Sequence, residues 1–378
     1  MKPSKKIILF FLIPIFFIFL FSIWLNSIYS SPLKNTHLNS SNLPNIEANA
    51  ISFLNKNMIT KNYLVYTNFK EYRSIFNLYL KKDNFLSESQ GILLQYFLNR
   101  NSKQDFDNTL KSTNNAFLLS NNIYSWKSYG LTKENTNALL DDLRILRAID
   151  DASSKWTDSN YKKLLLNYSK SLYLTNFKNG FPHQFYSQND ILPDKIPLFY
   201  LDIIAIESLS KYYKPYDEVV INSRNILSGA LIPNSPKLYT SYNYSTKHYE
   251  YDERINMVEF LYTAIHLQEA GFDISNTINW IQDEFFKNKK LYLAYDGVTM
   301  SPASNLESTA VYALASQLFL LDNKKSVAIL LLDKSTDFQV NSDSVISGSF
   351  GNEDTLTSFS FDNLQYILTS SLLYETNK

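Results

Sequence analysis

Acidic side chains beside aromatic ones stand at several places where the sequence predicts that a helix begins. The clearest case is Glu88, in the segment Ser-Glu-Ser-Gln-Gly at 87–91, which opens an apolar stretch at 92–98. Two carboxylates can supply the acid and the base that cleave a glycosidic bond, and aromatic rings can stack on sugar faces. These side chains are therefore suited to carbohydrate chemistry.

Glu88 has two possible roles. Ser87 and Gln90 have the spacing of a capping box, which places Glu88 in the first turn of the predicted helix. A helix N-terminus lowers the pKa of a carboxyl group, whereas a general acid at neutral pH needs a raised one. Catalysis therefore requires that burial in an aromatic cleft outweigh the helix dipole. The alternative is a first-turn glutamate that only complements the dipole.

A second acidic pair, Asp141 and Asp142, lies in a helix predicted at 134–152. On a helical wheel Asp142 falls between Leu146 and Ile149, so its carboxylate emerges from the apolar face, where an unpaired charge is costly. Asp142 therefore needs a partner. That partner is either a substrate or a neighbouring helix terminus or arginine.

A third cluster, Tyr-Glu-Tyr-Asp-Glu-Arg at 249–254, precedes a helix predicted at 255–270. On an ideal wheel Arg254 shares the arc of Met257 and Leu261, whereas Asp252 lies on the opposite side as a solvated first-turn residue. If the inner helices of a ring aim their N-termini at one cleft, however, such first-turn acids lie where a substrate would bind.

Several other chemistries are excluded by the sequence. It contains no HExxH, GxSxG or GxxxxGK[ST] motif, and its histidines (His37, His183, His248 and His266) lack metal-ligand spacing. With 0 cysteines, the chain has no disulfide, no thiolate metal site, no cysteine nucleophile and no lipidated cysteine. We expect neither a metal nor a cofactor. The balance of 36 Lys+Arg and 36 Asp+Glu also argues against a nucleic-acid partner.

Composition and periodicity predict an all-α domain. The 27 tyrosines, 26 phenylalanines and only 8 glycines suit packed helices better than turn-rich β structure. Apolar residues recur at helical spacing around 46–59, 69–81, 87–100, 103–119, 134–152, 158–177, 196–213, 215–228, 250–270, 273–288, 305–321, 325–333 and 359–375. No 34- or 40-residue repeat is present, so we expect a closed double ring of helices rather than a solenoid.

The N-terminal region predicts a membrane anchor. Lysines at 2, 5 and 6 precede an apolar run at 7–25, which is long enough to span the roughly 30 Å hydrocarbon core of a bilayer. The expected organisation is a cytoplasmic tail (1–6), a transmembrane signal anchor (7–25), a flexible spacer (26–43) and an exported domain (44–378). A cleaved signal peptide is the alternative, but its apolar region is usually shorter.

In order and spacing, these segments resemble glycoside hydrolase family 8, which includes bacterial cellulases, chitosanases and endoglucanases. The segment 87–91 is similar to the family's S-E-G-x-G-Y, whose glutamate is the catalytic acid. Further similar segments lie at 106–107, 123–126, 142–145, 197–202, 229–234 and 251–254. The match covers nearly the whole exported part.

The resemblance implies an (α/α)6 barrel, also called a six-hairpin toroid, that hydrolyses a β-linked polysaccharide with inversion. Glu88 would be the general acid and Asp252 the general base, with Glu253 and Glu250 as alternates. The expected substrate contacts are Trp126, Asp141, Asp142, Tyr200, Tyr251 and Arg254, of which the aromatic residues are alternatively packed core side chains.

Three departures indicate a divergent, exopolysaccharide-associated branch of the family. Leu140 replaces the first aspartate of the D-x-D pattern, Ser89 replaces a glycine, and Arg254 follows Asp252 by two residues rather than three. Asp141 stands beside Leu140, which leaves that sugar contact open.

We therefore expect an endo-acting, membrane-anchored enzyme that works outside the cell on the cell's own exopolysaccharide. The exopolysaccharide synthase machinery is a candidate partner. One alternative is a non-catalytic glycan-binding or assembly protein on the same fold. Another is a helical protein-interaction module, which would show a large exposed apolar patch.

Overall fold

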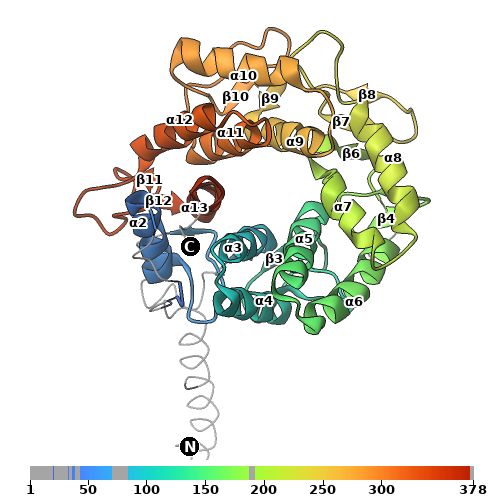
Figure 1. Ribbon diagram of the computed structural model, residues 1–378, viewed down its shortest axis with the longest axis horizontal. Helices are drawn as coiled ribbons and strands as arrows, with labels where there is room; N and C mark the ends of the chain where they lie inside the picture. Colours follow the sequence, from blue (N-terminus) through green and yellow to red (C-terminus); the bar gives the residue numbers. More distant parts are fainter. Residues whose placement is uncertain are drawn as a thin grey trace, which may run out of the picture.

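The computed structural model describes residues 20, 33, 36–38, 43–69, 84–186 and 192–374. These residues form two concentric rings of helices (Figure 1). The inner ring contains α3 (Ser87–Asn99), α5 (Leu139–Trp156), α7 (Ile203–Ser210), α9 (Met257–Glu269), α11 (Thr309–Leu321) and α13 (Ser360–Leu373). The outer ring contains α2 (Asn45–Phe53), α4 (Lys103–Phe117), α6 (Ser159–Asn176), α8 (Tyr216–Ser228), α10 (Ser275–Asn288) and α12 (Lys325–Ser335).

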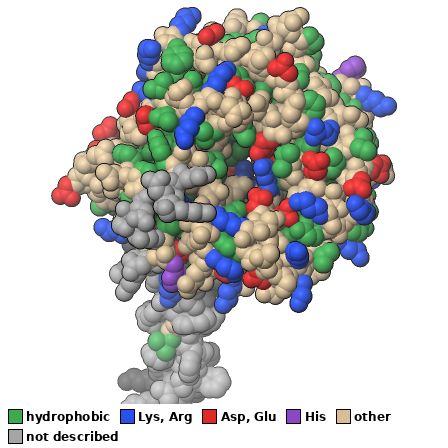
Figure 2. Space-filling view, viewed as in Figure 1, with side chains coloured by type: hydrophobic (Ala, Val, Ile, Leu, Met, Phe, Trp, Pro, Cys, Tyr) green, Lys and Arg blue, Asp and Glu red, His purple; other side chains and the backbone are tan. Residues whose placement is uncertain are grey.

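The inner ring is closed by contacts between successive helices, because each packs on the next and α13 packs back on α3. Most of the outer helices pack on the inner helix next to them in sequence, as α4 does on α3 and α12 on α11. A hollow remains in the middle of the ring, with acidic and basic side chains at its mouth (Figure 2). The expected closed double ring, the arrangement of an (α/α)6 barrel, is confirmed.

Short antiparallel strand pairs stand where inner helices begin. β2 (Phe85–Leu86), β9 (Arg254–Asn256) and β12 (Thr357–Phe359) run directly into α3, α9 and α13. Their partners are β3 (Lys127–Ser128) for β2, β10 (Ala294–Asp296) for β9, and β1 (Asn68–Phe69) and β11 (Gly351–Asn352) for β12. The remaining strands are β4 (Phe177–Lys178) paired with β5 (Phe181–Pro182), and the sheet β6 (Lys195–Pro197), β7 (Ser241–Asn243) and β8 (Tyr249–Glu250).

The strands shorten two predicted helices. The helix predicted from 250 or 255 begins at Met257, because the Asn256 side chain caps it by accepting from Val258 N and residues 254–256 pair with β10. The prediction that Arg254 lies on the helical arc is therefore wrong. The helix predicted at 196–213 is reduced to α7, because β6 occupies its start.

Four predicted segments lie wholly or mostly outside the described residues. These are the cytoplasmic tail at 1–6, the anchor at 7–25, of which only Leu20 is described, the spacer at 26–43, of which 33, 36–38 and 43 are described, and the helix at 69–81, of which only Phe69 is described, in β1. Among the described residues, no helix combines the length and the apolar character needed to cross a bilayer.

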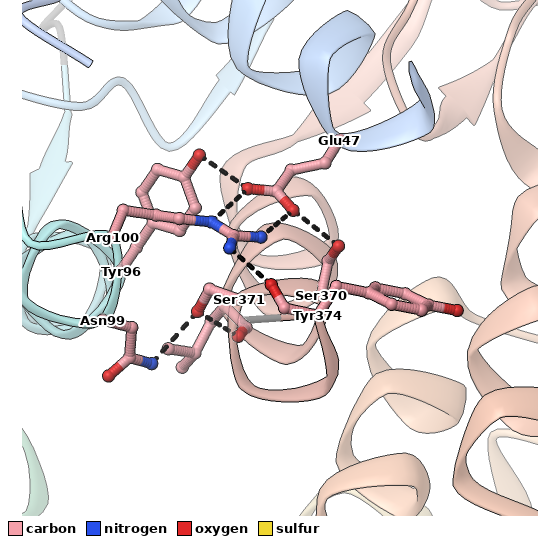
Figure 3. Close-up of polar contacts among 8 residues, drawn as sticks. Glu47, Tyr96, Asn99, Arg100, Ser370, Ser371 and Tyr374 are labelled. Atoms are coloured by element: carbon pink, nitrogen blue, oxygen red, sulfur yellow. Dashed lines mark hydrogen bonds and ion pairs between the residues drawn. The ribbon is translucent and has the colours of Figure 1, made fainter. Parts of the chain in front are cut away.

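A buried polar network joins the two ends of the described ring (Figure 3). Glu47 of α2 is 0% exposed and accepts hydrogen bonds from Tyr96 Oη (2.9 Å) and Arg100 Nε (2.8 Å) of the α3 region. Its second oxygen pairs with Arg100 Nη2 and accepts from Ser370 Oγ of α13 at 2.6 Å. Arg100 Nη1 donates to Tyr374 O. The network therefore fastens the first outer helix to the first and last inner helices.

We expect Glu47→Ala to destabilise the protein by about 3–5 kcal/mol, because it leaves the buried Arg100 guanidinium without its carboxylate. Urea unfolding measures the change. The control is Lys334→Ala, which removes a surface pair with Asp337 and should cost under about 1 kcal/mol. Equal effects of the two substitutions would contradict the assigned role of Glu47.

Candidate active site

Glu88 lies in the first turn of α3, directly after β2. The predicted capping box is wrong, since neither Ser87 nor Gln90 caps the helix. Ser87 Oγ donates instead to Asp141 Oδ2 at 2.8 Å, and Gln90 Oε1 accepts from Val65 N at 2.9 Å. Both side chains therefore make tertiary hydrogen bonds instead of capping the helix, and the Ser87–Asp141 bond connects the start of α3 to α5.

Two carboxylates and one guanidinium meet at this point. Arg144 Nη1 of α5 lies 3.2 Å from Asp141 Oδ1 and 4.0 Å from Glu88 Oε1. The Glu88 side chain is 31% exposed, whereas the side chain of Arg144 is 6% exposed. The Glu88 carboxylate is therefore accessible to solvent, whereas the arginine near it is buried.

Burial raises the pKa of Glu88 to about 7, and the charge of Asp141 adds to this effect while Arg144 opposes it. Burial likewise raises the pKa of Asp141, against the opposing effects of Arg144 and the Ser87 hydroxyl. A carboxyl group with a pKa near the working pH can give a proton to a leaving group. The electrostatics of Glu88 are therefore those of a general acid.

Gly91 makes room for the guanidinium. A Cβ atom at this position would lie 3.0 Å from Arg144 Cδ and 3.1 Å from Arg144 Cγ, which is closer than side chains normally approach. The glycine of the motif therefore allows the arginine of α5 to lie against α3, next to the acid.

Asp142 is 1% exposed, and both of its oxygens are bonded within the protein. It accepts from Tyr124 N at 2.9 Å and from Asn137 Nδ2 at 2.7 Å. Burial raises its pKa to about 8, while these two donors lower it. The expected need for a partner is confirmed, and the partners are Tyr124 N, in the turn that leads to Trp126, and Asn137, just before α5.

Trp126 stands beside the acid. Its carbonyl oxygen accepts from Ser87 N at 3.1 Å, next to the β2–β3 pair. The residue is 38% exposed, and Lys127 Nζ lies 5.4 Å from the ring centroid. Trp126 is thus an exposed aromatic residue whose backbone is hydrogen-bonded to Ser87, the residue before Glu88.

Asp252 lies in the turn between β8 and β9 and is exposed. Gly297 permits this turn, because a Cβ at that position would lie 2.2 Å from Asp252 O, and Gly297 N donates to Glu253 O at 2.7 Å. Glu253 is also exposed. Glu250 is held on β8 by Lys195 Nζ at 3.0 Å, which lowers its pKa.

Tyr200 lies close to acidic side chains of α3, α5 and α9, because the charges of Glu88, Asp141 and Glu259 affect its pKa. Burial raises its pKa to about 12, with further contributions from the charges of Asp141, Glu88 and Glu259. Glu259, in the first turn of α9, has its pKa raised by burial and then by Asp252. Glu259 and Asp252 line one small pocket with Phe199, the residue before Tyr200. Glu88, Asp141 and Glu259 are therefore all near enough to Tyr200 to affect its pKa, and Glu259 shares a pocket with Asp252.

No family model matches the sequence. The "Putative lipoprotein YdaJ" of Bacillus subtilis (strain 168) is 33% identical over 329 residues, which is 86% of this chain and 86% of YdaJ. The chain belongs to the YdaJ family.

Solved structures show that this YdaJ-family chain has the fold of glycoside hydrolase family 8. A chain described as a novel alpha-amylase from Clostridium perfringens is 26% identical, with a TM-score of 0.79 over 86% of this chain and 96% of that one. PssZ from Listeria monocytogenes is 22% identical, with a TM-score of 0.68 over 90% and 97%. The family 8 endoglucanase Cel10 from Klebsiella pneumoniae is 12% identical, with a TM-score of 0.58 over 83% and 96%. The family resemblance is thereby confirmed.

The remaining predicted residues lie at the β8–β9 turn. Tyr251 is half-buried and edge-on to Tyr239, with ring centroids 6.4 Å apart, and Arg254 is exposed on β9. The structure thus brings Asp141 and Tyr200 near Glu88 and bonds the Trp126 backbone to Ser87, while Tyr251 and Arg254 flank Asp252 in the chain.

Sequence reasoning missed Arg144, Glu259 and Tyr262. The guanidinium carbon of Arg144 lies 5.4 Å from the centre of the Tyr262 ring. Burial raises the pKa of Tyr262 to about 12, with Arg144 opposing and the charges of Glu88 and Asp141 adding to the effect. The spacing Glu259-x-x-Tyr262 places both residues in the first two turns of α9 on the same face. That spacing was visible inside the helix predicted at 255–270, but it could not show that Arg144 of α5 packs against Tyr262.

We expect the pKa of Glu88 to fall in Asp141→Asn, because removing a neighbouring negative charge favours the ionised glutamate. Carboxyl-carbon NMR titration of Glu88 measures this value directly. Asp343→Asn, which removes a charge from an exposed residue, is the control and should leave the titration unchanged. A Glu88 pKa near 4.5 in the unmodified protein would refute the raised value.

Proposed function

We propose that this chain is an extracytoplasmic glycoside hydrolase that cleaves a polysaccharide from within, with inversion at the anomeric carbon. The observation that carries the proposal is the accessible Glu88 carboxyl at the start of α3, 4.0 Å from Arg144 Nη1, which also pairs with Asp141 at 3.2 Å. Burial raises the pKa of Glu88 to about 7, which suits a proton donor. The family 8 fold supports it.

In the proposed mechanism, Glu88 donates its proton to the departing glycosidic oxygen. Asp252 accepts a proton from a water molecule that attacks the opposite face of the sugar. Inversion needs a carboxyl separation of about 6.5–9.5 Å, which leaves room for that water. Arg144 stabilises the Glu88 carboxylate once its proton has left, because its Nη1 lies 4.0 Å from Glu88 Oε1.

Asp252 is the preferred base for a physical reason. A general base must be ionised at the working pH. The pKa of neighbouring Glu259 is raised by burial and by the charge of Asp252, so Glu259 tends to hold a proton. Glu250 is engaged with Lys195, and Glu253 remains the alternate.

The proposed substrate contacts are the exposed ring of Trp126, the Tyr200 and Tyr251 rings, and the polar groups of Asp141 and Arg254. Asp142 is proposed to act indirectly, because its carboxylate holds the turn before Trp126. The substrate is proposed to be a β-linked glycan, the cell's own exopolysaccharide. Similarity to a chain described as an alpha-amylase favours an α-linked glucan as the second candidate.

Attachment to the membrane is proposed to use the apolar segment 7–25, with the domain outside the cell near the exopolysaccharide synthase machinery. YdaJ is named as a lipoprotein, but this chain has 0 cysteines and therefore lacks the residue that a bacterial lipid anchor modifies.

We expect the full-length protein to release new reducing ends from at least one glycan in a set of β-glucans, α-glucans and the producer's exopolysaccharide. Glu88→Gln should slow this release about 100- to 10,000-fold, because it removes the proton donor. Asp343→Asn is the control and should retain full activity. Undiminished hydrolysis by Glu88→Gln would rule out the assigned acid, and no hydrolysis of any glycan would favour a non-catalytic glycan-binding protein.

The base is tested by comparing Asp252→Asn with Glu259→Gln on the best substrate. We expect the first substitution to lower kcat by at least about 100-fold and the second to lower it less. Proton NMR of the first product should show an α anomer from a β-linked chain, or a β anomer from an α-linked one. A product with the anomeric configuration of the substrate would refute inversion.

A further inference from the structure

A second cavity of about 380 Å³ runs along the axis of the ring. We call it the axial cavity. Its polar lining includes Arg144, Arg147, Asp202, His266, Glu269 and Gln317. At one end it is lined by Asn99, Glu269 and Leu321, which are the last residues of α3, α9 and α11. This is the opposite end of the inner helices from Glu88.

The axial cavity reaches solvent at that end. Leu321 and Leu372, which line it, are 39% and 45% exposed. Towards the other end its lining includes Leu140, Arg144 and Tyr262, and Arg144 Nη1 lies 4.0 Å from Glu88 Oε1. Glu88 itself does not line the axial cavity, and Arg144 lies next to both.

Two buried side chains in the axial cavity have atoms with no hydrogen-bond partner among the described residues. These are Arg144 Nη2 and His266 Nδ1, in residues that are 5% and 4% exposed. An unpaired buried polar group costs roughly 1–3 kcal/mol, so such groups usually face a ligand or ordered water. Both nitrogens thus point to an occupant with polar atoms.

The charges of the lining disfavour an anionic occupant. Arg147 is already paired with Glu269 at 2.7 Å and with Asp202 at 3.4 Å. Burial lowers the pKa of His266, which keeps its ring neutral at neutral pH. The two arginines face three carboxylates, those of Asp202, Glu269 and Asp151, so the cavity has no excess positive charge for an anion.

We propose that the axial cavity binds a small neutral saccharide, of one or two sugar units, separately from the catalytic cleft. A hydroxyl both donates and accepts, so it can pair with His266 Nδ1 in either tautomer and accept from Arg144 Nη2. The leucines of the mouth offer apolar surface to the C–H face of a sugar ring. The volume is at the lower end for ligand pockets, which excludes a long chain.

The test is isothermal titration calorimetry of the full-length Glu88→Gln protein, in which turnover is suppressed. The probes are glucose, galactose, N-acetylglucosamine, cellobiose and maltose. In that background, Leu321→Trp narrows the mouth and should weaken saccharide binding at least tenfold. Leu372→Trp tests the same mouth from α13. Both positions are exposed, so the thermal unfolding midpoint should stay within a few degrees of the parent value.

Two controls separate the axial cavity from other sites. Leu330→Trp adds the same ring at a 48% exposed position of α12 that does not line the cavity, and should bind saccharide as the parent does. Trp126→Ala alters the proposed catalytic site. It should leave unchanged the saccharide binding that Leu321→Trp and Leu372→Trp weaken.

Parental affinity in both mouth variants, or the absence of binding by any probe, would overturn the inference. A loss of binding in Trp126→Ala alone would place the saccharide in the catalytic cleft and overturn it as well. Binding that is sensitive to the mouth variants in a protein that hydrolyses no glycan would overturn only the proposed function.

Discussion

The buried ion pair between Glu47 and Arg100 is the interaction on which the rest of the molecule depends. A closed ring of helices requires that the last helix pack against the first, as α13 packs against α3. Here a single carboxylate of α2 joins α3 and α13 through Arg100, Tyr96 and Ser370. Glu88 lies on the same α3, so the position of the proposed acid follows from the closure of the ring.

The proposed acid shows how two opposing effects on one group are balanced. The N-terminus of α3 favours an ionised Glu88, as does Arg144. Burial and the nearby Asp141 carboxylate act in the other direction and prevail. The distance of 4.0 Å from Arg144 Nη1 to Glu88 Oε1, against 3.2 Å to Asp141 Oδ1, is consistent with this result.

The ring itself was predictable, because apolar residues at helical spacing mark almost every inner and outer helix. The strands were not, since pairs of two or three residues have too short a periodicity to detect. The predicted start of α9 failed for this reason, because residues 254–256 pair with β10 and the helix begins only at Met257. The capping box at Ser87 failed because local spacing cannot show that Asp141, 54 residues away, binds the same hydroxyl.

The motif was enough to propose Glu88 as the acid, whereas the residues that surround its carboxyl group were only partly predicted. Asp141 was named as a substrate contact, but its hydrogen bond to Ser87 and its ion pair with Arg144 depend on how α5 packs against α3. The contact between Gly91 and Arg144 is likewise tertiary, because a sequence shows that a glycine is present but not what approaches it.

The strand pairs at the helix starts have a further consequence. Trp126 and Asp252 stand on turns beside β3 and β9, and neither takes part in the polar network that closes the ring. These turns can therefore gain, lose or exchange side chains during evolution while the helical scaffold stays intact. If the turns can change while the helices do not, chains described as an alpha-amylase and as an endoglucanase can share one architecture.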